Sequence, residues 1–118
     1  MADPDPRKIT RKWLTKTTRA LLDLRSDIDE TIDRAAQQDI NGLLIERGRV
    51  HGLLSTVRRA EEEFEASRMT FNPPTQQIID QTVEKAGDLG KLVLSAKKAA
   101  AIVALVTDLT VFVTGIIS

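Results

Sequence analysis

The feature that most constrains this chain is its C-terminal segment, residues 99–118, with the sequence AAAIVALVTDLTVFVTGIIS. The segment is long enough to cross a bilayer, and its one charged residue, Asp108, lies near its middle. An α-helix that is apolar on every side has to be covered, either by lipid or by other parts of a protein. The fold and the function of the chain therefore depend on what covers this segment.

Insertion of this segment into a membrane is close to neutral in free energy. Its strongly apolar side chains would together gain roughly 3 to 6 kcal/mol, whereas an acid at the centre costs about 2.5 to 3.5 kcal/mol. An intramembrane Asp108 would also need a polar partner, which implies an assembly of several chains. We therefore expect other helices to cover the segment. The alternative is a membrane-active or tail-anchored protein of pore, holin or translocator type, with Lys97 and Lys98 on the cytoplasmic side.

Composition indicates one helical domain that spans residues 1–118. The chain is 42% hydrophobic and 29% charged, as is typical of a globular domain with a single core. Aromatic residues make up only 3%, so the core has to consist of Leu, Ile, Val and Ala, the common filling of helical bundles. The chain has no cysteine, which excludes disulfides and thiolate metal sites.

The N-terminal sequence bears on the location of the protein, and the net charge bears on its partner. The N-terminal sequence MADPDPRK contains no apolar stretch, so we expect no signal peptide and a cytoplasmic protein, membrane-associated if the tail inserts. The formal net charge is zero, which argues against a nucleic-acid-binding protein that relies on overall charge.

Helix signals predict an all-α fold with breaks after the first and second helices. Asp5 followed by Pro6 is a typical helix start. The sequence QQDING at 37–42 marks the first break, with Asp39 or Asn41 as the cap of the next helix. The two prolines of TFNPPTQQ mark the second break. The predicted helices span about 6–37, 41–68 and 74–117.

The second predicted helix carries a heptad repeat of apolar residues, as in a coiled coil. Such a repeat packs against a neighbouring helix that lies nearly parallel or antiparallel to it. The residues are Leu43, Val50, Leu53, Val57, Ala60 and Phe64.

The third predicted helix is too long for its partners. Over residues 74–117 it would measure about 65 Å, against about 40 to 48 Å for the first two. We therefore expect an antiparallel three-helix bundle with a long C-terminal helix that extends beyond the others. The alternative is a split near Gly87 and Gly90, each of which costs about 1 kcal/mol of helix propensity, to give a four-helix bundle.

Cations crowd the start of the first helix, where they oppose the helix dipole by about 0.3 to 1 kcal/mol each. This placement indicates a patch for an anionic partner, such as lipid headgroups, nucleic acid or an acidic protein face. The alternative is pairing with acidic residues of a neighbouring helix or of another copy. Trp13 is either an interfacial anchor of this patch or a residue at the edge of the core. The patch comprises Arg7, Lys8, Arg11, Lys12, Trp13, Lys16 and Arg19.

Little in the sequence indicates chemistry. His51 is the only histidine, which we interpret as structural or exposed, and Glu61 and Glu65 are the one i, i+4 pair in EEEFE, which we interpret as a solvated face. No phosphate loop, nucleophile elbow or zinc signature is present. We therefore expect no catalytic residue, no metal, no cofactor, no small-molecule substrate and no enzymatic activity.

The sequence thus favours an interaction protein that works through helix–helix contact. Its partner would be a second copy of the chain or another helical protein, bound through segment 99–118. In this hypothesis four apolar residues anchor the partner and Asp108 fixes their register. The predicted association surface is Leu105, Asp108, Leu109, Phe112 and Val113.

Overall fold

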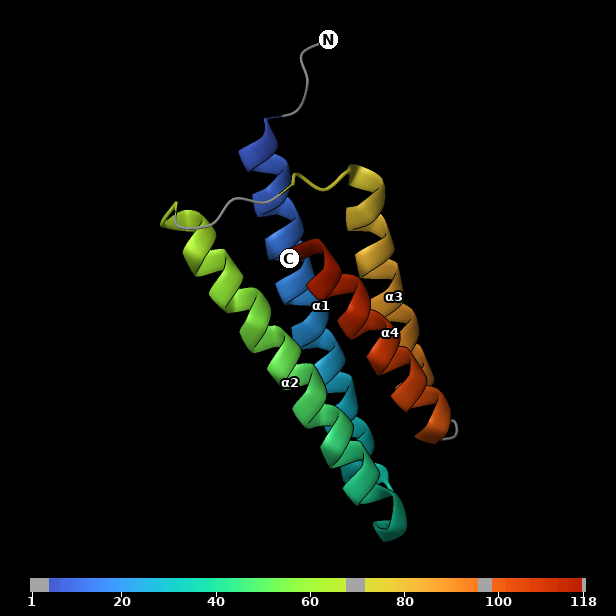
Figure 1. Ribbon diagram of the computed structural model, residues 1–118. Helices are drawn as coiled ribbons and strands as arrows, with labels where there is room; N and C mark the ends of the chain where they lie inside the picture. The colour runs from blue at the N-terminus through green and yellow to red at the C-terminus, as the bar shows by residue number, and fades with distance from the viewer. Residues whose placement is uncertain (1–4, 68–71, 96–98, 118) are drawn as a thin grey trace.

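The computed structural model describes residues 5–67, 72–95 and 99–117, and it confirms the predicted all-α bundle. Within those ranges the chain forms four helices (Figure 1). They are α1 (Pro6–Arg34), α2 (Gln37–Glu65), α3 (Gln76–Leu94) and α4 (Ala99–Ile117).

The first helix begins where the sequence predicts. Asp5 Oδ1 accepts a hydrogen bond from the backbone N–H of Arg7 at 2.9 Å, and Pro6 occupies the first turn. Two extended residues, Ala35 and Ala36, then connect α1 directly to α2.

The predicted break at QQDING is wrong, because residues 37–42 form the first turns of α2. Neither Asp39 nor Asn41 is the cap; that position belongs to Ala36, which makes no side-chain cap bond. Isolated turn-forming residues such as Gly42 cost a helix only about 1 kcal/mol each, and the helix that begins at Gln37 buries Leu43 in the core. Asp39 in the first turn instead stabilises α2 through the helix dipole.

The single long helix expected over 74–117 is also wrong. The chain ends α3 at Leu94, caps it with Ser95, whose Oγ donates to the Leu92 carbonyl at 2.8 Å, and begins α4 at Ala99. The four-helix alternative is therefore the observed fold, but the split does not lie at Gly87–Gly90, which is inside α3. A helix tolerates isolated glycines at about 1 kcal/mol each, and ending α3 there would remove Val93 from the core.

The four helices are arranged as two antiparallel hairpins packed side by side (Figure 1). Contacts join α1 to α2, α1 to α3, α2 to α4 and α3 to α4, so in the described chain α1 and α4 lie diagonally opposite each other. Because the chain reverses at each connection, α1 and α3 run parallel, and so do α2 and α4. The last helix folds back onto α2 and α3, and this contact replaces the expected extension beyond its partners.

Aliphatic side chains from all four helices fill the core, as the composition predicts. All six residues of the predicted heptad repeat in α2 are buried. A buried hydrogen bond is among the polar links between the hairpins: the Nε1–H of the fully buried Trp13 donates to Thr82 Oγ1 at 3.0 Å. From α4 the core takes Ile102, Val106, Leu109 and Val113.

The membrane alternative requires a helix that can span a bilayer. In the ranges that the structure describes, no helix combines the necessary length and apolarity.

Candidate functional site

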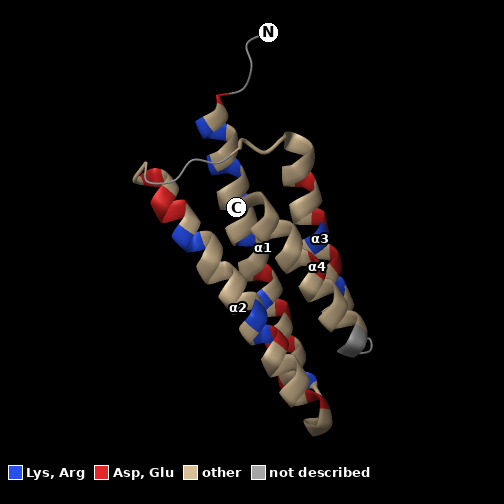
Figure 2. Cartoon of the chain, viewed as in Figure 1, with Lys and Arg blue, Asp and Glu red and all other residues tan. Residues whose placement is uncertain are grey.

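Charges along α1 and α2 are placed so that opposite signs meet across the hairpin. Near one end, Arg11 Nε lies 2.7 Å from Glu65 Oε1, and the acidic end of α2 lies beside the basic start of α1 (Figure 2). Further along the hairpin, Arg47 pairs with Asp29, so there the basic residue belongs to α2 and the acidic residue to α1. The basic start of α1 and the acidic end of α2 therefore suit an antiparallel hairpin, although both placements oppose the helix dipoles.

The Arg11–Glu65 pair shifts the titration of both groups. The hydrogen bond from Arg11, supported by its charge, lowers the pKa of Glu65, and the hydrogen bond to Glu65 raises the pKa of Arg11. Arg11 of the basic cluster therefore pairs with an acidic residue of a neighbouring helix, which is the alternative to an anionic partner.

The other members of the predicted anionic-partner patch have different surroundings. The guanidinium of Arg7 lies 4.6 Å from the centre of the Phe64 ring, and Lys12 Nζ donates to Gln76 Oε1 at 2.8 Å. Trp13 is fully buried, so its interpretation as an interfacial anchor is wrong: the Thr82 hydroxyl gives its N–H a partner inside the bundle. The remaining cations are exposed and make no ion pair with a described residue: Lys8, Lys16 and Arg19.

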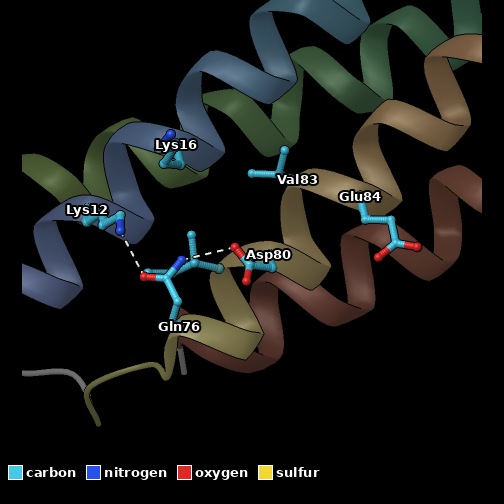
Figure 3. A pocket seen from close by; sticks show the side chains of 7 residues that line it. Lys12, Lys16, Gln76, Asp80, Val83 and Glu84 are labelled. Atoms are coloured by element: carbon cyan, nitrogen blue, oxygen red, sulfur yellow. Dashed lines mark hydrogen bonds between the residues drawn. The ribbon is translucent and has the colours of Figure 1, made fainter.

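A groove between α1 and α3 adjoins these cations (Figure 3). Lys12 and Lys16 line one side of it, and Asp80 and Glu84 line the other. Gln76 crosses the groove, accepting from Lys12 and donating to Asp80 Oδ1 at 3.0 Å. Because both signs of charge line the groove, it does not provide a uniformly positive surface for an anion.

The predicted association residues of α4 divide between two environments. Leu109 and Val113 are buried in the core of the chain itself, so they are not available as anchors for a partner. Leu105 is exposed, and Phe112 is half-buried. Their separation follows from the helical repeat, because Leu109 and Val113 share the inward face with Ile102 and Val106, whereas Leu105 lies at its edge.

Asp108 has a partner within the chain. Its Oδ2 accepts a hydrogen bond from Lys85 Nζ at 3.1 Å, and the same ammonium group lies 5.1 Å from the centre of the Phe112 ring. The pair joins α3 to α4 at the surface. The one charge of α4 is thus neutralised by the neighbouring helix.

The outward side of α4 is a surface that the sequence did not distinguish from the core side. Its residues recur at intervals of three and four, opposite the buried repeat, and all of them are exposed. Val111 is 65% exposed, and Asp108 is the one charged residue in the sequence of α4. The spacing of three and four residues was the signal that could have predicted this surface. In a segment that is apolar all round, however, the buried repeat and the exposed repeat have the same spacing, so the spacing does not predict which of them faces the core. We call this surface the outer face of α4; it comprises Ala101, Ala104, Asp108, Val111 and Gly115.

His51, Glu65 and Glu46 each make contacts within the bundle. The exposed His51 accepts a hydrogen bond through Nδ1 from Arg25 Nη1 at 3.0 Å, when that nitrogen is unprotonated, and Glu65 is held by Arg11. Glu46 is buried, which the sequence did not indicate, and it binds Arg49, whose other nitrogen donates to Thr107 of α4. Among the residues that the structure describes, no cluster of His, Cys, Asp and Glu could hold a metal ion.

The fold and its surfaces define an all-α four-helix protein. No protein-family model, curated protein or solved structure matches the chain. Its function therefore has to be inferred from the contacts and surfaces described above.

Proposed function

We propose that this chain is a non-enzymatic helical interaction protein that binds a second helical surface through the outer face of α4. The observation that carries the proposal is the near absence of charge on an exposed helix. In the described part of the chain, α4 has one charged side chain, and Lys85 already pairs with it. A surface helix in water normally carries charged residues on its outward side.

Internal packing does not account for this composition. The inward repeat of α4 supplies what the core needs, yet the opposite side also holds Val111 and alanines in place of lysine or glutamate. Exposed apolar surface of this kind is typical of sites of protein–protein contact. Small residues such as Ala104 also allow the backbone of another helix to come close.

The experiment is a surface substitution, because deletion of the tail would remove core residues such as Leu109. We expect Val111→Glu to abolish association, measured as the sedimentation coefficient of the full chain in detergent-free buffer over a range of concentrations. The matched control is Thr15→Glu, which places the same charge at an exposed position of α1. Equal association of the wild type and Val111→Glu would contradict the proposal.

A further inference from the structure

The exposed apolar surface of α4 continues onto α2. Arg49 of α2 donates to Thr107 of α4, and the two helices run in the same direction. One turn earlier on each helix, residues on the same sides as this pair are Ile45 and Val103. Ile45 is 64% exposed and Val103 is 43% exposed, and the register set by the Arg49–Thr107 hydrogen bond places both at the same level of two neighbouring helices. The outer face of α4 is therefore one half of a wider two-helix surface.

The part of α2 beside this surface contains glycines with no packing role inside the chain. A Cβ added at Gly48 or Gly52 would meet no atom within 4 Å. Glycine within a helix lowers stability relative to alanine, because it costs more conformational entropy. The backbone of α2 is consequently open to close approach from outside, along the same side as Ile45. We call the surface of Ile45, Gly48, Gly52, Val103, Ala104 and Val111 the α2/α4 face.

The α2/α4 face has fewer exposed charges than the opposite side of the bundle. The α1/α3 side carries exposed Lys16, Arg19, Asp80 and Glu84. On the α2/α4 side, along the stretch from Ile45 to Gly52 and from Val103 to Val111, the charged groups are Arg49 and Asp108, and each is held by a partner of the same chain, Glu46 and Lys85 respectively. Beyond this central stretch, the exposed Arg59 follows Ile45 and Gly52 at the same spacing of seven residues and makes no ion pair with a described residue. Over the central stretch two such faces can meet without repulsion between like charges.

The size of the face matches a small specific interface. With 19 residues α4 is about 28 Å long, and two adjacent helices are about 18 to 20 Å wide. Two copies in contact would bury on the order of 1,000 Å² in total, close to the smallest area expected of a specific complex. One helix alone would bury about half of that, so the contribution of α2 is required.

We propose that the α2/α4 face is the contact between two copies of this chain. This inference rests on the proposed function and deepens it by naming the partner and by adding α2 to the surface. A second copy is favoured because the central stretch of the face, from Ile45 to Gly52 and from Val103 to Val111, offers no unpaired charge by which a different protein would be selected, and specificity between unlike partners commonly uses such charges. Identical faces related by a two-fold axis satisfy each other, as in most homodimers.

The first test is the molar mass of the full chain by sedimentation equilibrium without detergent. We expect a dimer for the wild type and a monomer for Ile45→Glu. Ser26→Glu, at an exposed position of α1, is the matched control and should remain dimeric. Helix content measured by circular dichroism should be the same in all three, because both substituted side chains are exposed.

A second test uses the absence of cysteine, which allows a single nitroxide label to be attached at one chosen position. We expect a label on Ile45→Cys to become immobile as the protein concentration rises, and a label on Ser26→Cys to stay mobile. A wild type that is monomeric at every concentration would overturn the inference. A dimer that Val111→Glu dissociates and Ile45→Glu does not would overturn the role of α2 but leave the proposed function standing. A dimer that resists both substitutions would overturn both proposals.

Discussion

Ser67 is the one described residue outside glycine with a positive φ, 58°, and it lies directly after the C-cap of α2. Its backbone N–H donates to the Phe64 carbonyl at 3.0 Å, which closes the end of the helix. Glycine is the usual residue at this position, because it adopts the left-handed conformation without a steric penalty from Cβ.

We therefore expect Ser67→Gly to raise the free energy of unfolding by about 1 kcal/mol. Ser55→Gly is the control, because Ser55 is exposed within α2 and the same change there should lower stability by about 0.5 to 1 kcal/mol. Urea denaturation measures both. Equal effects of the two substitutions would contradict the assignment of strain to Ser67.

Asp27 of α1 lies against Gly90 of α3. A Cβ at Gly90 would come within 2.5 Å of Asp27 Oδ2, so the absence of a side chain at Gly90 makes room for this carboxylate. Desolvation raises the pKa of Asp27, and the nearby charges of Glu30 and Asp23 raise it further.

A raised folded-state pKa means that the fold binds the proton of Asp27 more tightly than the unfolded chain does. Its contribution to stability is fully present below the unfolded pKa and is lost as the pH rises through the folded pKa. We expect Asp27→Asn to be more stable than the wild type at neutral pH and to lose this advantage in acid, measured by urea denaturation over a pH series. Asp33→Asn, an exposed carboxyl on the same helix, controls for the loss of one negative charge. Parallel pH profiles for the wild type and Asp27→Asn would rule the effect out.

At the scale of the elements, polar contacts fix how α3 lies along α1. Trp13 donates to Thr82 Oγ1, and the Thr82 hydroxyl itself donates to the Ile78 carbonyl at 2.8 Å. Near the other end, Thr31 Oγ1 lies 3.3 Å from the Val93 carbonyl. These contacts set the register of two parallel helices whose apolar surfaces would also allow neighbouring registers.

Thr82→Val should lower the free energy of unfolding by about 1 to 3 kcal/mol, because it leaves the buried N–H of Trp13 without an acceptor. Thr82→Ser keeps the hydroxyl and should cost less. Trp13 is the only tryptophan of the chain, so its fluorescence during urea denaturation reports this contact directly. A cost for Thr82→Ser as large as that for Thr82→Val would show that the lost methyl group, and not the hydrogen bond, is responsible.

The two sides of α4 should respond differently to truncation of a leucine. Leu109 is 1% exposed, so Leu109→Ala should cost about 2 to 5 kcal/mol of stability through the cavity it leaves. Leu105 is 39% exposed, and Leu105→Ala should cost less than about 1 kcal/mol. Thermal or urea denaturation of the two variants checks this, and a similar loss for both would mean that α4 does not pack with Leu109 inward.

At the scale of the whole molecule, α4 completes the core although α1, on the diagonal, does not contact it. A chain ending at Ser95 would uncover those parts of α2 and α3 that pack against α4. We expect that chain to stay helical but to lose its cooperative unfolding transition and to bind a hydrophobic dye such as ANS. Far- and near-ultraviolet circular dichroism measure the two properties separately. A cooperative transition at the urea midpoint of the full chain would show that three helices are sufficient.

The sequence by itself determined the helical class, the start of α1 at Pro6 and the buried heptad of α2. These depend on local capping and on a periodicity that one amphipathic helix displays unaided. It did not determine the break after Leu94, because no strong helix-stopping residue marks it. It also did not determine that residues 37–42 are helical, because the packing of α2 against α1 outweighs the turn preference of these residues.

Only the tertiary structure decided which face of the C-terminal segment turns inward and which partner Asp108 takes. The segment is apolar all round, so two repeats at the same spacing compete for the core, and the choice depends on how α2 and α3 are placed. Folding back buries Leu109 and Val113 and brings Asp108 to Lys85. The residues left outside, above all Val111, are therefore those that tertiary packing did not use, and they form the surface that we propose for a partner.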